Sequence, residues 1–185
     1  MPQTAVLLAN LGTPAQPQAR EVGRFLREFL SDPRVVDLPR WLWLPLLYLV
    51  IVPLRARRSA AAYRKIWLKE GSPLLVLTLR LAEKLSRRLH DKAVVVTGMR
   101  YGEPSIAYAL AALQQKGIKR LIVLPLYPQF SATTTSSVFD AVDIALQKLD
   151  WQPEQVRIND YHRQPQWIAA VADSINAYRQ REGGT

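Results

Sequence analysis

LIVLPLYPQFSATTTSS, residues 121–137, is the stretch that decides the fold. It opens with a nearly continuous apolar run, which is typical of a parallel strand covered on both faces. Pro125 and Pro128 then end the strand, because proline lacks the N–H group that a sheet ladder needs. Aromatic and hydroxyl side chains follow at the carboxyl end, where open α/β sheets bind their ligands. The stretch therefore predicts a buried strand and a binding loop. The alternative is a strand followed by an ordinary helix cap, although a cap needs only one hydroxyl.

Composition limits the classes of protein to which the chain can belong. Its 185 residues are enough for about one domain with a sizeable core. The net charge of +10 favours nucleic acid, an anionic membrane surface or an acidic small ligand as partner. Absence of cysteine excludes disulfides, a thiolate zinc site and a cysteine nucleophile. With His90 and His162 as the only histidines, no self-contained metal site is expected.

The opening residues MPQTAVLLANLG predict a first strand rather than a targeting signal. No basic region precedes the apolar run, and no small-residue cleavage site follows it. We therefore expect a cytoplasmic protein, with peripheral association at the inner membrane as a further expectation. A lone Gly12 after this strand falls far short of a phosphate-binding glycine loop.

Strand and helix signals alternate along the whole chain. This alternation predicts an α/β protein with an open, Rossmann-like parallel sheet of about four strands, right-handed crossovers and helices on both faces. The helix expected over 73–90 repeats leucines at spacings of three and four, which predicts a buried leucine face. That face comprises Leu74, Leu77, Leu81, Leu85 and Leu89. The expected strands are 5–9, 93–97, 121–126 and 155–158, and the expected helices are 18–30, 60–69, 73–90, 105–116, 136–149 and 164–181.

Residues 38–58 form an apolar segment that ends in an arginine cluster. Its apolar part, LPRWLWLPLLYLVIVPL, is shorter than the roughly 20 residues of a spanning helix. Pro45 and Pro53 are expected to break it as a helix. Aromatic rings followed by arginines are typical of an interfacial membrane anchor, and the predicted membrane lip comprises Trp41, Trp43 and Tyr48. The alternative is an ordinary core helix with solvated arginines at Arg55, Arg57 and Arg58.

Five ordered motifs resemble ferrochelatases, most closely the bacterial form, over essentially the whole chain. They are LLANLGTP at 7–14, FLSDPRVVDLPR at 29–40, GSPL at 71–74, GMRYGEPS at 98–105 and LPLYPQFSATTT at 124–135. Ferrochelatases insert ferrous iron into protoporphyrin IX to give protohaem in haem biosynthesis. They use two similar α/β halves that enclose the porphyrin. The resemblance therefore implies a chelatase-type fold, with porphyrin and ferrous iron as substrates.

The resemblance also implies that residues 1–185 are the amino-terminal chelatase domain. Neither His90 nor His162 matches the S-x-H motif of the family, so the catalytic His and Glu are expected beyond Thr185. No catalytic or metal-binding residue is expected in this chain, which alone is predicted to be inactive. Its carboxyl-terminal half is an expected partner. Ala132 occupies the place of a cysteine in cluster-bearing members, so no iron–sulfur cluster is expected.

Candidate porphyrin-binding residues follow from matching the motifs position by position. Arg100 lies near a strand end between glycines, where it could hold a propionate through a two-pronged contact. For others a plain structural role is the alternative: Tyr63 in the core, Ser72 as a helix cap and Arg55 as a solvated charge. The candidates are Leu11, Arg55, Tyr63, Ser72, Arg100, Tyr127 and Ser131.

Two other classes of function remain alternatives. One is a porphyrin- or haem-binding module without chemistry, and the other is a peripheral membrane-binding domain. Nucleic acid is not an expected partner, because the arginines are dispersed and no RNP, KH or helix-turn-helix signature is present.

Overall fold

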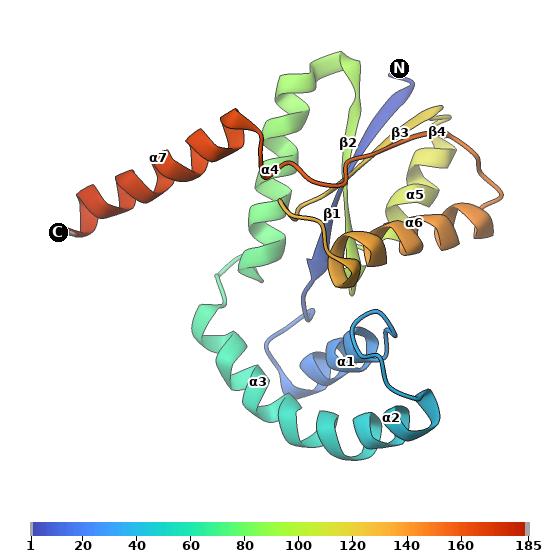
Figure 1. Ribbon diagram of the computed structural model, residues 1–185, viewed down its shortest axis with the longest axis vertical. Coiled ribbons are helices and arrows are strands. Elements are labelled where there is room, and N and C mark those ends of the chain that lie inside the picture. The colour runs from blue at the N-terminus through green and yellow to red at the C-terminus, as the bar shows by residue number, and fades with distance from the viewer. Residues whose placement is uncertain (1, 184–185) are drawn as a thin grey trace.

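The computed structural model describes residues 2–183, which form an α/β body and a helical lobe (Figure 1). The body is built on a four-stranded sheet with the strand order β2-β1-β3-β4 and parallel pairing throughout. Its strands are β1 (Thr4–Gly12), β2 (Val94–Tyr101), β3 (Arg120–Pro125) and β4 (Glu154–Arg157). The predicted open parallel sheet and α/β class are confirmed.

Alternate side chains of β1 point to opposite faces of the sheet, as strand geometry requires. Leu7 and Ala9 pack in the larger core with α5 (Ile106–Gln115) and α6 (Ser137–Lys148). Leu8 packs on the other face, against side chains of α4 (Pro73–Leu89). The sheet is therefore covered by helices on both faces, as the sequence predicts.

Helix α4 buries only part of the leucine face that the sequence predicts: Leu85 and Leu89 pack toward the sheet, but other positions differ. Val76 and Thr78 are buried, whereas Leu77 is 59% exposed and Leu81 45% exposed. The first half of this helix, PLLVLTL, is apolar on nearly every side. Periodicity alone therefore could not select the face that meets the sheet, and the prediction for Leu77 and Leu81 is wrong.

The helical lobe consists of the chain between β1 and α4 (Figure 1). Its elements are α1 (Ala19–Leu30), α2 (Arg40–Leu46), a π-helical turn (Leu47–Ile51) and α3 (Val52–Ile66). Leu47, Val52 and Ala56 form its small core. The lobe therefore has apolar packing of its own, separate from the two faces of the sheet.

The prolines of the lobe do not break its helices, contrary to expectation. Pro45 lies inside α2, and Pro53 occupies the first turn of α3, immediately after the π-helical turn at Leu47–Ile51. The wide π-helical turn between the two prolines joins the two helices. Such turns occur where the regular i→i−4 hydrogen bonds of an α-helix are interrupted. Helix α3 accordingly begins at Val52 and ends at Ile66, rather than spanning 60–69.

The carboxyl-terminal helix α7 (Pro165–Glu182) extends away from the body, and none of its residues is buried (Figure 1). Its base is held by an edge-to-face contact between Tyr161 and Trp167, with ring centroids 6.1 Å apart. Ile168 and Ile175 are among its exposed apolar side chains.

Candidate functional site

Several candidate residues meet at the carboxyl edge of the sheet. Asn10 and Gly12 of β1 are paired with Met99 and Tyr101 of β2, so Leu11 lies at the same level as Arg100. The backbone N–H of Leu126 donates to the carbonyl of Ala9 at 2.7 Å, which places the start of the following loop beside the end of β1. That loop carries Tyr127 and Ser131. Leu11, Arg100, Tyr127 and Ser131 therefore come from three neighbouring strand ends, as the sequence predicts.

Two glycines let the loops after β1 and β2 touch. Gly12 has a φ of +105°, and a Cβ there would lie 1.7 Å from the carbonyl oxygen of Tyr101. Gly102 has a φ of +78°, and a Cβ there would lie 2.9 Å from the carbonyl oxygen of Thr13. No L side chain is tolerated at such distances, so the edge of the sheet depends on glycine at both positions.

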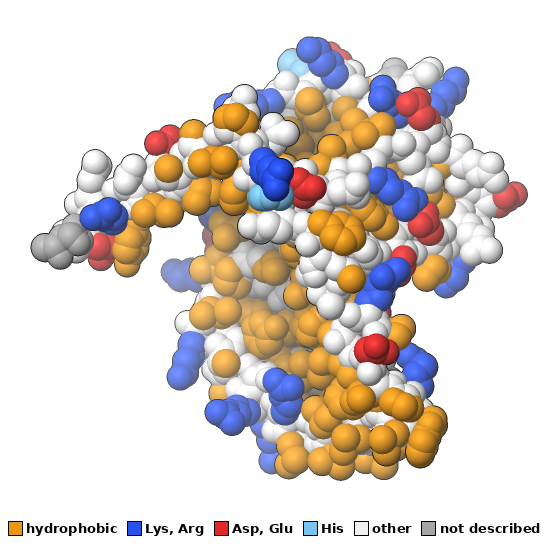
Figure 2. All heavy atoms as spheres, in the orientation of Figure 1, with side chains coloured by type: hydrophobic (Ala, Val, Ile, Leu, Met, Phe, Trp, Pro, Cys, Tyr) orange, Lys and Arg blue, Asp and Glu red, His pale blue; other side chains and the backbone are white. Residues whose placement is uncertain are grey.

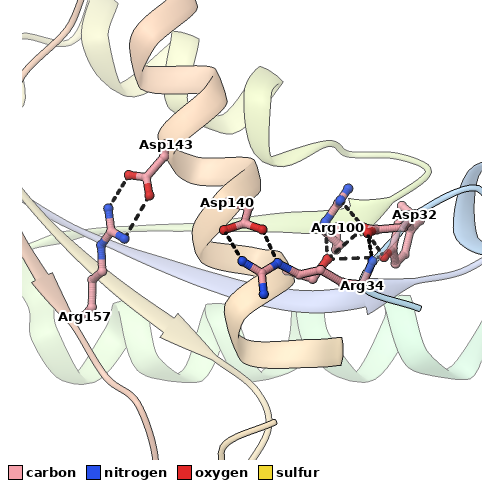
Figure 3. Close-up of polar contacts among 8 residues, drawn as sticks. Asp32, Arg34, Arg100, Asp140, Asp143 and Arg157 are labelled. Carbon is pink, nitrogen blue, oxygen red and sulfur yellow. Dashed lines mark hydrogen bonds and ion pairs between the residues drawn. The ribbon is translucent and has the colours of Figure 1, made fainter. Parts of the chain in front are cut away.

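A buried polar cluster joins the lobe to this edge (Figure 3). We call it the Asp32 clasp, and it comprises Asp32, Arg100, Tyr101 and Ser137. The Asp32 carboxylate accepts hydrogen bonds from the Tyr101 hydroxyl at 2.8 Å and the Ser137 hydroxyl at 3.0 Å. It also forms an ion pair with Arg100, whose Nε donates to Ser137 Oγ at 2.7 Å. The clasp ties the loop after α1 to the end of β2 and the start of α6.

The clasp sets the ionisation of its members. Burial acts to raise the pKa of Asp32, but the Arg34 N–H, the Tyr101 and Ser137 hydroxyls and the charge of Arg100 outweigh it and lower the pKa below its usual 3.8. Burial raises the pKa of Tyr101 to about 12. Asp32 is thus a carboxylate and Tyr101 a neutral donor at neutral pH.

This depressed pKa predicts a specific loss of stability in acid. A group whose pKa is lower in the folded state contributes stability above its unfolded pKa and loses it as the pH falls through the folded pKa. We expect the free energy of unfolding to fall more steeply from about pH 5 to about pH 2 in the natural chain than in Asp32→Asn. Urea unfolding at a series of pH values measures this difference. Parallel pH profiles for the two proteins would contradict it.

Arg100, a predicted porphyrin-binding residue, is engaged within the protein. Its guanidinium is directed to Asp32 and Ser137, and only 22% of the side chain is exposed. A propionate contact would have to compete with this ion pair. Arg100 therefore belongs to the clasp, and its contact with a propionate stays a prediction. Sequence reasoning missed Asp32, because an acidic residue between a helix end and Pro33 looks like an ordinary helix stop.

A second set of ion pairs braces α6 from its exposed side (Figure 3). Arg34, in the same loop as Asp32, forms a two-pronged pair with Asp140, in which Nη2 donates at 2.9 Å. Arg157 of β4 forms a similar pair with Asp143, in which Nη1 donates at 3.1 Å. Both pairs are partly exposed, so removing one partner should cost much less stability than it does in a buried pair.

Arg55, Tyr63 and Ser72 lie on the lobe side of the site. Arg55 is exposed on α3, and Tyr63 is half-buried, with its ring edge-to-face against Trp67 at 6.2 Å. Ser72 is buried and occupies the N-cap position of α4, as the cap alternative predicts, although its side chain makes no capping hydrogen bond. It lines a cavity of about 220 Å³, together with Thr13 and other residues of the adjoining loops.

Three buried hydroxyls near the strand ends have no hydrogen-bond partner within residues 2–183. They belong to Thr13, Tyr127 and Thr135, which follow β1 and β3. Burial raises the pKa of Tyr127, so its hydroxyl stays neutral. Buried polar groups without a partner are uncommon and call for an explanation such as bound water or a ligand. Over the same residues, no group of three or more His, Cys, Asp or Glu side chains could hold a metal ion.

The predicted membrane lip divides into an outward and an inward part. Trp41 of α2 is 79% exposed, and Tyr48 of the following π-helical turn is also exposed. Figure 2 shows hydrophobic side chains gathered over α2 at the bottom of the view. Trp43 instead packs on the lobe core, and its Nε1 donates to the Leu30 carbonyl at 2.7 Å. The prediction for Trp43 is corrected, because one face of α2 must cover α1. Between Pro2 and Gly183, no helix combines the length and hydrophobicity that crossing a bilayer requires.

An open parallel sheet with helices on both faces and a polar carboxyl edge defines the class: a parallel α/β protein, a class in which ligands commonly bind at the ends of the strands. A family profile described as Ferrochelatase matches residues 3–184. The ferrochelatase of Xylella fastidiosa (strain M12) is 51% identical over 180 residues, covering 97% of this chain and 56% of the relative. That of Vibrio cholerae serotype O1 is 48% identical over 178 residues, covering 96% and 55%. The chain belongs to the ferrochelatase family and spans about half the length of these curated relatives.

Proposed function

We propose that this chain is the amino-terminal, porphyrin-binding domain of a ferrochelatase, a lyase that inserts ferrous iron into protoporphyrin IX to give protohaem. The observation that carries the proposal is the convergence of Leu11, Tyr127 and Ser131 on one sheet edge. A porphyrin is a flat apolar plate with two propionates, so it needs apolar walls and polar donors at its rim. This edge offers both kinds of group, with the buried hydroxyl of Tyr127 still without a partner.

The lobe is proposed to supply the opposite wall and the charge for the propionates. Arg55 of α3 is exposed, and within residues 2–183 it has no ion-pair partner. It is therefore better placed than Arg100 to bind a propionate. Figure 2 shows a recess lined with hydrophobic side chains inside the arch of α3 and α4. We assign the porphyrin to this recess, with its rim toward α3.

Metal insertion is proposed to need a second region that corresponds to the remaining length of the relatives. Proton removal from two pyrroles requires a positioned base. His90 is exposed beyond the end of α4. His162 lies beside the loop after β3, where its backbone N–H donates to the Pro128 carbonyl at 3.0 Å, but it does not match the S-x-H motif of the family. The base and the site that delivers ferrous iron therefore belong to the proposed partner region.

The exposed apolar surface over α2 is proposed to bind an anionic membrane peripherally. Trp41 and Leu49 are each more than three-quarters exposed, and the arginines at the start of α3 follow directly. Indole rings partition to headgroup depth, and guanidinium groups are attracted to anionic lipid. A cytoplasmic domain docked at the inner membrane in this way could take up an apolar porphyrin from the bilayer.

A chimera tests the catalytic proposal. Residues 1–185 replace the matching part of the Xylella fastidiosa ferrochelatase, and the rate at which zinc protoporphyrin forms is measured by fluorescence. We expect insertion by the chimera and only the uncatalysed rate with residues 1–185 alone. A folded chimera that binds porphyrin but inserts no metal would overturn the proposed role. The unmodified relative is the positive control.

A further inference from the structure

A groove of about 640 Å³ lies between α1 and α3 on the surface of the lobe. Its floor is apolar and includes Gly23, Val52 and Ala56. Its rim carries Arg20 and Arg27 from α1 and Arg57 from α3. The groove therefore combines an apolar base with three guanidinium groups, and the function proposed above gives it no role.

These three arginines have no acidic partner in the part of the chain that the structure describes. Arg27 is half-buried, and its Nη1 would lie 3.7 Å from a Cβ on Gly23, next to the floor. Arg20 lies in the first turn of α1, where the helix dipole disfavours a positive charge. The dipole favours Arg27 in the last turn, but it does not account for Arg20 or Arg57. The positive charges of Arg20 and Arg57 are therefore balanced neither by the helix dipole nor by an acidic side chain among residues 2–183.

Geometry separates this rim from the proposed porphyrin side of α3. Successive residues of an α-helix are about 100° apart around the axis, so Arg55 and Arg57 project to opposite sides of Ala56, which packs toward α1. Arg57 lines the groove and Arg55 does not. Neighbouring arginines of one helix therefore serve two different surfaces.

The apolar part of the groove continues toward the membrane lip. Pro53 and Leu54 line it, and Leu54 is 72% exposed. Both lie in the first turn of α3, next to the π-helical turn that carries the exposed Leu49 and Val50. A ligand that fits this surface has a negatively charged group at one end and an acyl chain at the other.

We propose that the groove between α1 and α3 binds one anionic glycerophospholipid, with its phosphate against Arg20, Arg27 and Arg57 and an acyl chain passing Leu54 toward the lip. This inference rests on the proposed membrane association and deepens it. The lip supplies general apolar attachment, and the groove selects the charge of the headgroup. Charge complementarity and continuity with the lip favour a lipid as the occupant.

The test uses dihexanoyl phosphatidylglycerol below its micelle concentration, titrated into residues 1–185 by calorimetry. We expect saturable binding that is about 30-fold weaker in Arg27→Gln/Arg57→Gln, from two lost attractions to one anionic group. The conservative Arg27→Lys/Arg57→Lys should keep most of the affinity. A matched control, Arg88→Gln/Arg179→Gln, removes the same charge from two exposed positions on α4 and α7 and should bind as the natural chain does.

Each other outcome has a definite meaning. Equal affinity for dihexanoyl phosphatidylcholine, or unchanged affinity in the Arg27→Gln/Arg57→Gln protein, overturns the proposal. Equally tight binding of inorganic phosphate overturns the lipid as the source of the anion. Failure of the proposed membrane docking is distinguishable from failure of the proposed lipid groove. In the first case the protein would still bind short-chain lipid but would not sediment with vesicles.

Discussion

Replacing Arg100 with leucine is expected to lower the free energy of unfolding by about 3 to 5 kcal/mol, the cost of breaking a buried ion pair by removing one partner. Asp32 is buried and would keep its negative charge without the guanidinium that now balances it. Hydrogen bonds from Tyr101 and Ser137 would remain, but neither brings a positive charge. Urea unfolding of residues 1–185 at pH 7 measures the loss.

Two further variants show whether the loss comes from the clasp. Asp32→Asn combined with Arg100→Leu removes both charges, so it should recover a large part of the stability lost in Arg100→Leu. Arg34→Leu breaks the partly exposed pair with Asp140 and should cost much less stability than Arg100→Leu. Equal effects of Arg100→Leu and Arg34→Leu would mean that the Asp32 pair behaves as a surface pair.

Replacing Trp41 and Leu49 with serine is expected to weaken binding to anionic vesicles by more than about 100-fold. Both side chains are highly exposed, and burying two large apolar side chains contributes about 3 kcal/mol, at roughly 1.4 kcal/mol per decade. Salt should weaken vesicle binding of the natural chain only partly, because apolar contacts are not screened. Vesicle sedimentation measures the partition coefficient.

The controls for the lip use residues elsewhere in the fold. Ile168→Ser/Ile175→Ser removes two exposed apolar side chains from α7 and should leave sedimentation unchanged. Trp43→Ser should lower the melting temperature instead, because this ring packs on the lobe core. A loss of stability in Trp41→Ser/Leu49→Ser equal to that in Trp43→Ser would place all three side chains in the core.

Sequence patterns predicted the elements that depend on local chemistry. The apolar run 121–126 indicated β3, which spans Arg120–Pro125, because a strand covered on both faces needs apolar side chains in succession. The prolines, glycines and hydroxyls after the strands indicated the loops at the carboxyl edge. Parallel strand pairing then places Leu11, Tyr127 and Ser131 at one edge of the sheet, so no additional sequence motif was needed to predict that they lie together.

Sequence patterns failed where the outcome depends on distant contacts. Asp32 and Ser137 are 105 residues apart, and their hydrogen bond exists only after the lobe docks on the body. Trp41 and Trp43 are the same residue type in one apolar segment. Only the contact with Leu30 distinguishes the inward ring of Trp43 from the outward ring of Trp41. Pro53 resembles a helix breaker until it is seen to occupy the first turn of α3.

Mapping the porphyrin by hydrogen–deuterium exchange tests the central claim most directly. Residues 1–185 are compared with and without saturating protoporphyrin IX, and amide exchange is followed along the chain. The account predicts slower exchange in the strand-end loops at 10–13 and 126–131 and in α3 (Val52–Ile66), and unchanged exchange in α7 (Pro165–Glu182). The account is contradicted if no site is protected, or if protection is confined to α7 or to α1 (Ala19–Leu30).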